Sequence, residues 1–166
     1  MMKTTKSKNR RIFQRILQFL LALSVMFAPL RAYAEIAETE LNGELLNASS
    51  EFLRDLDYET WQLVAYKYPD EKGKLLLRVI GYPGSLRIDH PLQLRVESGR
   101  KEWYLDDKTL SNESLVNDSR QAAAEFDLDF LISELSNNRP LRLSLEGVFS
   151  ELPVPPFLVE EWRSLN

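Results

Sequence analysis

Two neighbouring stretches, TWQLVAYKY at 60–68 and KLLLRVIGY at 74–82, decide the fold class of this chain. Both are rich in β-branched, aromatic and leucine side chains, which favour strands. The residues between them include Pro69 and Gly73, which are typical of a turn. We therefore predict a β-hairpin. Its nearly continuous apolar content indicates strands that are covered on both faces or lie within a sheet.

Further strands are expected on the C-terminal side of this hairpin. Apolar and polar side chains alternate over 92–97 and 141–146, which predicts half-buried strands. After a tight connection at 98–100, residues 101–105 return as a strand with Trp103 and Tyr104 on opposite faces. A short strand is expected over 152–154.

Two short helices accompany these strands. Leu128, Leu131, Ile132 and Leu135 follow helical spacing, with Asp127 in position to cap the helix. A second helix is expected over 157–165, after Pro156. The polar stretch 106–124 is interpreted as a long surface loop, with one helical turn at 122–124.

These elements predict a mainly β, β-rich α+β fold: a single-domain antiparallel sandwich or open barrel with one or two short helices. We place this domain at residues 51–166. Residues 35–50 are acidic and weakly patterned, and we expect a flexible segment there.

Residues 1–34 resemble an export signal peptide. They carry seven Lys and Arg side chains and no acid, followed by an apolar run over 16–30. The motif Ala32-Tyr33-Ala34 predicts cleavage between Ala34 and Glu35. The apolar run is shorter than the roughly 18 to 20 residues that a membrane span needs. We therefore expect no stable membrane span after cleavage.

The remaining chain is strongly acidic. It holds 14 basic and 25 acidic side chains, a net charge of −11. Nucleic-acid binding needs clustered Lys and Arg, so we expect no nucleic-acid partner. The chain has no cysteine, which excludes disulfides, thiolate metal sites and cysteine nucleophiles.

Several segments, from about Arg54 to Trp162, resemble a family of exported cyanobacterial proteins labelled only as a domain of unknown function. The similar segments are LRD at 53–55, WQLV at 61–64, LRVIGYPG at 77–84, HPL at 90–92, FDL at 126–128, PLRL at 140–143, and VPPFLV at 154–159 with Glu161-Trp162. The resemblance implies a photosynthetic bacterial source and a destination in the periplasm or thylakoid lumen. It implies no catalytic residue.

No group of residues predicts a catalytic or metal site. His90 is the one histidine; Asp89 and Ser85 are near it, but adjacent residues on an extended segment point to opposite faces. Asp106-Asp107 and the pair Asp127 and Asp129 are the densest acids, and turn or helix-start roles explain them.

Two other kinds of site were weighed. A calcium site would draw on oxygens in the 106–118 loop, from Asp106, Asp107, Asn112, Glu113, Asn117 and Asp118, but the EF-hand spacing is absent. No phosphate-binding glycine motif occurs, and we expect no cofactor. Tyr66 and Tyr68 share a strand face with Gln62, so we predict an exposed partner surface there.

The sequence therefore favours an exported, soluble accessory or interaction domain that acts by protein contact in the periplasm or thylakoid lumen. We lean away from an enzyme. Two alternatives stay open: a carboxylate-based hydrolase of envelope polysaccharide, and a carrier that binds a small ligand or Ca²⁺.

Overall fold

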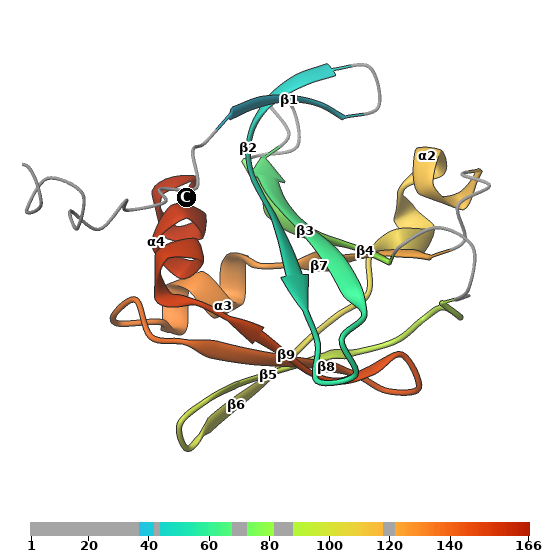
Figure 1. Cartoon of the computed structure of the whole chain (residues 1–166). Coiled ribbons are helices and arrows are strands. Elements are labelled where there is room, and N and C mark those ends of the chain that lie inside the picture. Colours follow the sequence, from blue (N-terminus) through green and yellow to red (C-terminus); the bar gives the residue numbers. More distant parts are fainter. Residues whose placement is uncertain (1–36, 42–43, 68–72, 82–87, 118–121) are drawn as a thin grey trace, which may run out of the picture. The chain divides into compact units, whose positions relative to one another are not determined.

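The strands predicted over 60–68 and 74–82 form the centre of the larger sheet in the computed structural model (Figure 1). β3, Thr60–Lys67, pairs antiparallel with β4, Leu75–Gly81, and Leu63 lies opposite Val79. This confirms the two strands and their pairing. The structure describes residues 37–41, 44–67, 73–81, 88–117 and 122–166, so most of the predicted turn at 69–73 lies outside the described residues.

The strands form two antiparallel sheets, and both are visible in Figure 1. The five-stranded sheet has the order β1-β2-β3-β4-β7, and the four-stranded sheet has the order β6-β5-β8-β9. The remaining strands are β1 Ala37–Leu41, β2 Glu44–Arg54, β5 Leu94–Ser98, β6 Lys101–Leu105, β7 Ala123–Asp127, β8 Leu141–Leu145 and β9 Phe149–Val154. The strand-rich α+β prediction is confirmed, and the described strands do not close into a barrel.

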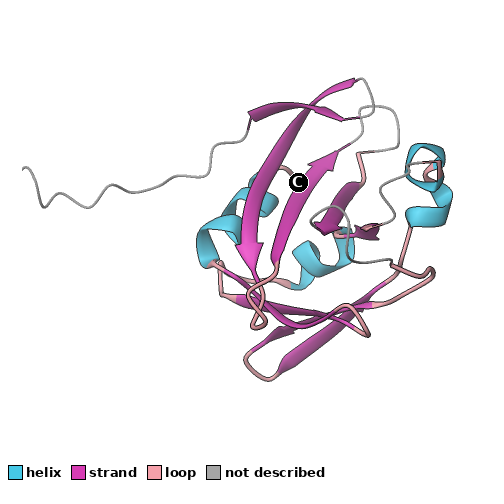
Figure 2. Cartoon of the chain, turned by 45° about the vertical axis from the view of Figure 1, so that its right-hand side comes forward, coloured by secondary structure: helices cyan, strands magenta, loops and turns pink. Residues whose placement is uncertain are grey.

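The main hydrophobic core joins the two sheets. Alternate side chains of the larger sheet, such as Leu63 and Leu77, pack in one cluster with Val96 and Leu143 of the smaller sheet. Two helices, α3 Asp129–Glu134 and α4 Pro156–Ser164, add their apolar faces to this cluster. Figure 2 shows both helices beside the strands. Burying apolar surface contributes about 25 cal/mol of stabilising free energy per Å², and it is the main contribution that stabilises such layers.

The opposite face of the five-stranded sheet carries a second, smaller cluster. It consists of Ala48, Val64, Tyr66 and Leu76, all buried. A 3₁₀ helix, η1 Thr109–Ser111, and the one-turn α2 Glu113–Val116 lie on this side, because Asn112 between them bonds to Glu125 of β7. In Figures 1 and 2, α2 and α4 lie on opposite sides of the sheet.

The structure differs from the sequence-based expectations in residues 35–50 and in the stretch 106–124, which was expected to be a surface loop but contains η1, α2 and the start of β7. Residues 35–50 were expected to be flexible, but β1 and the first part of β2 lie there and pair with each other. Residues 122–124 were expected to form a helical turn, but Ala123 and Ala124 belong to β7. Their small side chains fit because β7 completes the sheet beside β4, with Ala124 opposite Val79. Tertiary pairing thus overrides the helical preference of alanine.

Candidate functional site

A rigid turn joins β2 to β3, and Asp55 organises it. The buried Asp55 carboxylate accepts hydrogen bonds from the backbone N–H groups of Asp57 and Glu59, both at 2.9 Å. Its other oxygen accepts the indole N–H of Trp61, also at 2.9 Å. The N–H of Leu56 donates to the Glu151 carbonyl of β9 at 3.2 Å. These bonds hold the turn against the neighbouring sheet.

This turn presents two apolar side chains to solvent. Tyr58 is 80% exposed and Leu56 is 59% exposed. Tyr58 also has a left-handed backbone, with φ of 66°. This conformation is uncommon for a residue with a bulky side chain, and it persists only where surrounding bonds enforce it. The backbone N–H of Tyr58 donates to the Asp55 carbonyl at 3.2 Å, so the bonds of Asp55 maintain this conformation.

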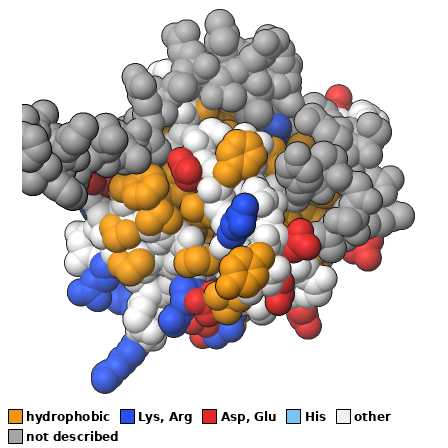
Figure 3. All heavy atoms as spheres, in the orientation of Figure 1, with side chains coloured by type: hydrophobic (Ala, Val, Ile, Leu, Met, Phe, Trp, Pro, Cys, Tyr) orange, Lys and Arg blue, Asp and Glu red, His pale blue; other side chains and the backbone are white. Residues whose placement is uncertain are grey.

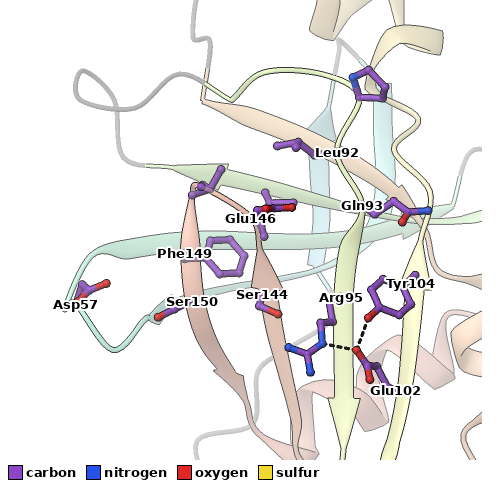
Figure 4. Close-up of a pocket in the computed structure, with 14 residues that line it drawn as sticks. Asp57, Leu92, Gln93, Arg95, Glu102, Tyr104, Ser144, Glu146, Phe149 and Ser150 are labelled. Carbon is purple, nitrogen blue, oxygen red and sulfur yellow. Dashed lines mark hydrogen bonds and ion pairs between the residues drawn. The ribbon is translucent and has the colours of Figure 1, made fainter.

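A groove with a volume of about 860 Å³ lies beside this turn, on the solvent-facing side of the four-stranded sheet. Figure 4 shows Asp57 of the turn at the end of the groove opposite Glu102 and Tyr104. Strands β5, β6, β8 and β9 all contribute lining residues. Its volume falls within the range of about 300 to 1,000 Å³ that is typical of small-molecule sites.

Three side chains at one end of the groove interact closely (Figure 4). The Glu102 carboxylate accepts hydrogen bonds from the Tyr104 hydroxyl and from Arg95 Nε. The hydrogen bond to Glu102 raises the pKa of Tyr104. The Tyr104 hydroxyl, followed by Arg95, lowers the pKa of Glu102. Arg95 also forms an ion pair with Glu97. The Tyr104 hydroxyl is therefore hydrogen-bonded to a network of three charged side chains, Glu102, Arg95 and Glu97.

A buried polar cluster lies on the face of the five-stranded sheet that points away from the main hydrophobic core. The Tyr66 hydroxyl donates to the Glu125 carboxylate, and Arg78 donates to the same carboxylate from Nη2 at 3.0 Å. Arg78 Nη2 also donates to the Tyr66 hydroxyl oxygen at 2.9 Å, and Asn112 adds a weaker bond to Glu125. All three partners of this core triad are almost fully buried. A buried ion pair survives when such bonds satisfy both charges.

The predicted partner surface at Tyr66 and Tyr68 requires a correction. Tyr66 is completely buried, because β7 brings Glu125 beneath its hydroxyl. The polar hydroxyl therefore bonds to a buried carboxylate and does not face solvent. Tyr68 lies outside the described residues, as do Ala34 and Glu35 at the predicted cleavage site.

His90 bonds to Asp107, which lies 17 residues further along the chain. Because a carboxylate only accepts, His90 Nδ1 donates to Asp107 Oδ2, at 2.7 Å. Leu92 N–H and the Thr109 N–H and hydroxyl also donate to Asp107. Burial alone raises the pKa of Asp107, but the bonds from Thr109, His90 and Leu92 outweigh it and lower that pKa. This arrangement connects the segment before β5 to the segment after β6.

Asp127 and Asp129, two of the candidate catalytic acids, have structural contacts. Asp127 accepts the backbone N–H of Asp129 at 3.0 Å, and Asp129 accepts that of Leu75 at 3.1 Å. Asp106 is exposed beside the buried Asp107. Among the described residues, no group of three or more His, Cys, Asp or Glu side chains is placed to hold a metal ion, and Asp118 of the 106–118 loop is not described.

A family model described as "protein of unknown function (DUF3122)" matches residues 34–165. The chain belongs to the DUF3122 family. No curated protein matches the chain, and no solved structure matches it. All described strands lie within the DUF3122 match, as do the turn and the groove. In the described part of the chain, no helix has the length and apolarity needed to cross a membrane.

Sequence reasoning missed both the exposed turn and the groove. A signal for the turn was present in Asp55-Leu56-Asp57-Tyr58, because aspartate readily bonds to backbone N–H groups two residues onward. Trp103 and Tyr104 were expected on opposite faces of their strand, and this is confirmed, because Trp103 is buried and Tyr104 is 55% exposed. The groove had no local signal, because its lining comes from four segments that are separate in the sequence.

Proposed function

We propose that this protein is an exported accessory domain that acts by protein contact, with the Leu56–Tyr58 side of the β2–β3 turn as its contact surface. The observation that carries the proposal is the exposed Tyr58 on a turn held by Asp55. Tyrosine and leucine on a rigid support lose little conformational entropy on binding. Exposed aromatic anchors of this kind dominate many protein interfaces.

The distribution of exposed apolar side chains supports this choice. Eight large apolar side chains are exposed in the described part of the chain, and Phe52, Leu56 and Tyr58 fall within seven consecutive residues. On the face drawn in Figure 3, hydrophobic side chains reach the surface in separate patches with charged side chains between and below them. Apolar patches bounded by polar groups are typical of protein contact sites.

The compartment is part of the proposal and rests on sequence. The basic, acid-free stretch followed by an apolar run and Ala32-Tyr33-Ala34 supports export. The resemblance to exported cyanobacterial proteins supports a location in the periplasm or thylakoid lumen. The acidic mature chain supports a protein partner over nucleic acid.

The best substitution for testing the contact is Tyr58→Gly. Glycine adopts the left-handed conformation without steric cost, so the folded state of Y58G should be at least as stable as the wild type. The aromatic contact would nevertheless be lost. We expect Y58G to keep its melting temperature and to lose the partner that the tagged mature protein retains from membrane fractions. Phe130→Ala removes another exposed aromatic side chain, from α3, and serves as the matched control.

Photo-crosslinking makes the test specific for position. A photoreactive phenylalanine analogue at position 58 should crosslink to one defined protein, while the same analogue at position 130 should not. The proposal would be rejected if both positions yield the same products, or if Y58G and F130A retain the partner equally.

A further inference from the structure

The groove on the four-stranded sheet is distinct from the contact proposed for Tyr58, although Asp57 links the two regions. Its floor consists of outward-facing side chains of β5, β6 and β8, including Arg95, Tyr104 and Ser144. These three lie side by side in the sheet, because Arg95 pairs with Tyr104 on one side and with Ser144 on the other. The groove therefore crosses the strands instead of following one of them.

Tyr104 offers an aromatic surface within this groove. Its side chain is 55% exposed, while its hydroxyl donates to Glu102, which also accepts from Arg95. The ring is therefore held in place before any ligand arrives, which lowers the entropic cost of binding. The face of an aromatic ring is electron-rich, and it attracts the weakly positive C–H groups of a ligand.

The rest of the groove is rich in groups that can both donate and accept hydrogen bonds. Gln93, Ser144 and Ser150 each supply a donor and an acceptor, and Asp57 and Glu146 supply acceptors. Neither of these two carboxylates forms an ion pair with another described residue. Such a set matches a ligand whose neighbouring hydroxyl groups donate and accept at the same time.

Charge narrows the class of ligand. Among the described residues, the groove contains Asp57, Glu102 and Glu146 and one cation, Arg95, which is engaged by Glu97 and Glu102. An anionic ligand would therefore be repelled. An added peptide strand gains most of its affinity from main-chain hydrogen bonds along a sheet edge. Because this groove crosses four paired strands, its floor offers a ligand mainly side chains.

We propose that this groove binds an uncharged saccharide chain, with one sugar ring against the face of Tyr104 and with hydroxyl groups of this and the following sugar units bonded to Gln93, Glu146 and Asp57. The aromatic ring supplies contact with the C–H face of the sugar. The amide and carboxylates supply the directional hydrogen bonds that select a hydroxylated ligand. Binding at this site does not depend on the protein contact at Tyr58.

The test is an NMR titration of the isotope-labelled mature protein with four probes. Two probes are neutral, cellohexaose and the hexamer of N-acetylglucosamine; one is anionic, oligogalacturonate; one is basic, hexalysine. We expect at least one neutral probe to shift the signals of Gln93, Tyr104 and Glu146. We expect Tyr104→Ala to weaken that binding about tenfold or more. Tyr104→Phe keeps the ring and should weaken it less.

The control is Phe130→Ala, which removes an exposed aromatic from α3, outside the groove. F130A should leave saccharide binding unchanged. Y58G should also leave it unchanged, even if Y58G abolishes the protein contact. The inference is overturned if neither neutral saccharide binds at about 10 mM. It is also overturned if Y104A binds as well as the wild type, or if hexalysine occupies the groove in preference to both neutral probes.

Discussion

The two buried tryptophans Trp61 and Trp162 provide a matched pair for measuring what holds the β2–β3 turn. Both side chains are at most 1% exposed. The indole N–H of Trp61 donates to Asp55 at 2.9 Å, whereas that of Trp162 has no hydrogen-bond partner in the described part of the chain. Substitution by phenylalanine removes the same atoms at both positions. The two substitutions therefore lose similar packing contacts. They differ in that only Trp61→Phe also removes a hydrogen bond.

The magnitude follows from the chemistry of the acceptor. A hydrogen bond to a charged group contributes about 1.5 to 3 kcal/mol, and Asp55 is buried, so water cannot replace the lost donor. We expect Trp61→Phe to lower the free energy of unfolding by about 1.5 to 3 kcal/mol more than Trp162→Phe. The measurement is urea unfolding of the mature chain at neutral pH, followed by far-UV circular dichroism, with equal m-values as the condition for comparison.

A double-mutant cycle isolates the contact. In an Asp55→Ala background, Trp61→Phe should cost about as much as Trp162→Phe, because the acceptor is already absent. Equal destabilisation by the two substitutions in the wild-type background would refute the assigned role of the Trp61–Asp55 bond. A larger cost for Trp162→Phe would refute it too.

Two further predictions concern the other buried carboxylates. Asp107→Asn should lower stability at neutral pH by about 1 to 3 kcal/mol, because it weakens bonds from His90 and Thr109. Since folding lowers the pKa of Asp107, its contribution is complete above the usual aspartate pKa and is lost as pH falls through the folded-state value. Acid unfolding curves should therefore be shallower for D107N; parallel curves would contradict this assignment. Glu125→Ala should cost about 3 to 5 kcal/mol, because it leaves Arg78 buried without this carboxylate; a loss below about 1 kcal/mol in denaturant unfolding would show that the pair is dispensable.

Local patterns in the sequence predicted most of the strands correctly. Alternation over 92–97, 101–105 and 141–146 corresponds to β5, β6 and β8, within one or two residues at most ends. The spacing of Leu128, Leu131 and Ile132 predicted α3, and Pro156 opens α4 as expected. These successes have one cause: a side chain's position along a strand or helix is set by its immediate neighbours.

Which face of a strand is covered depends on partners that are distant in the sequence. Tyr66 and Tyr104 are both aromatic residues in strands, yet one is completely buried and the other is 55% exposed. Tyr66 is covered because β7 brings Glu125 to it, 59 residues further along the chain. No local pattern contains that pairing, so the exposed partner surface expected at Tyr66 was wrong.

The sequence by itself determined the class of this protein: an acidic, cysteine-free chain with strand periodicity and two short amphipathic helices. Only the tertiary structure decided which side chains meet. It joined Asp55 to Trp61, His90 to Asp107, and Arg95 to Glu102. Periodicity is a property of neighbouring residues, whereas the turn, the triad and the groove arise from the order in which distant strands pair.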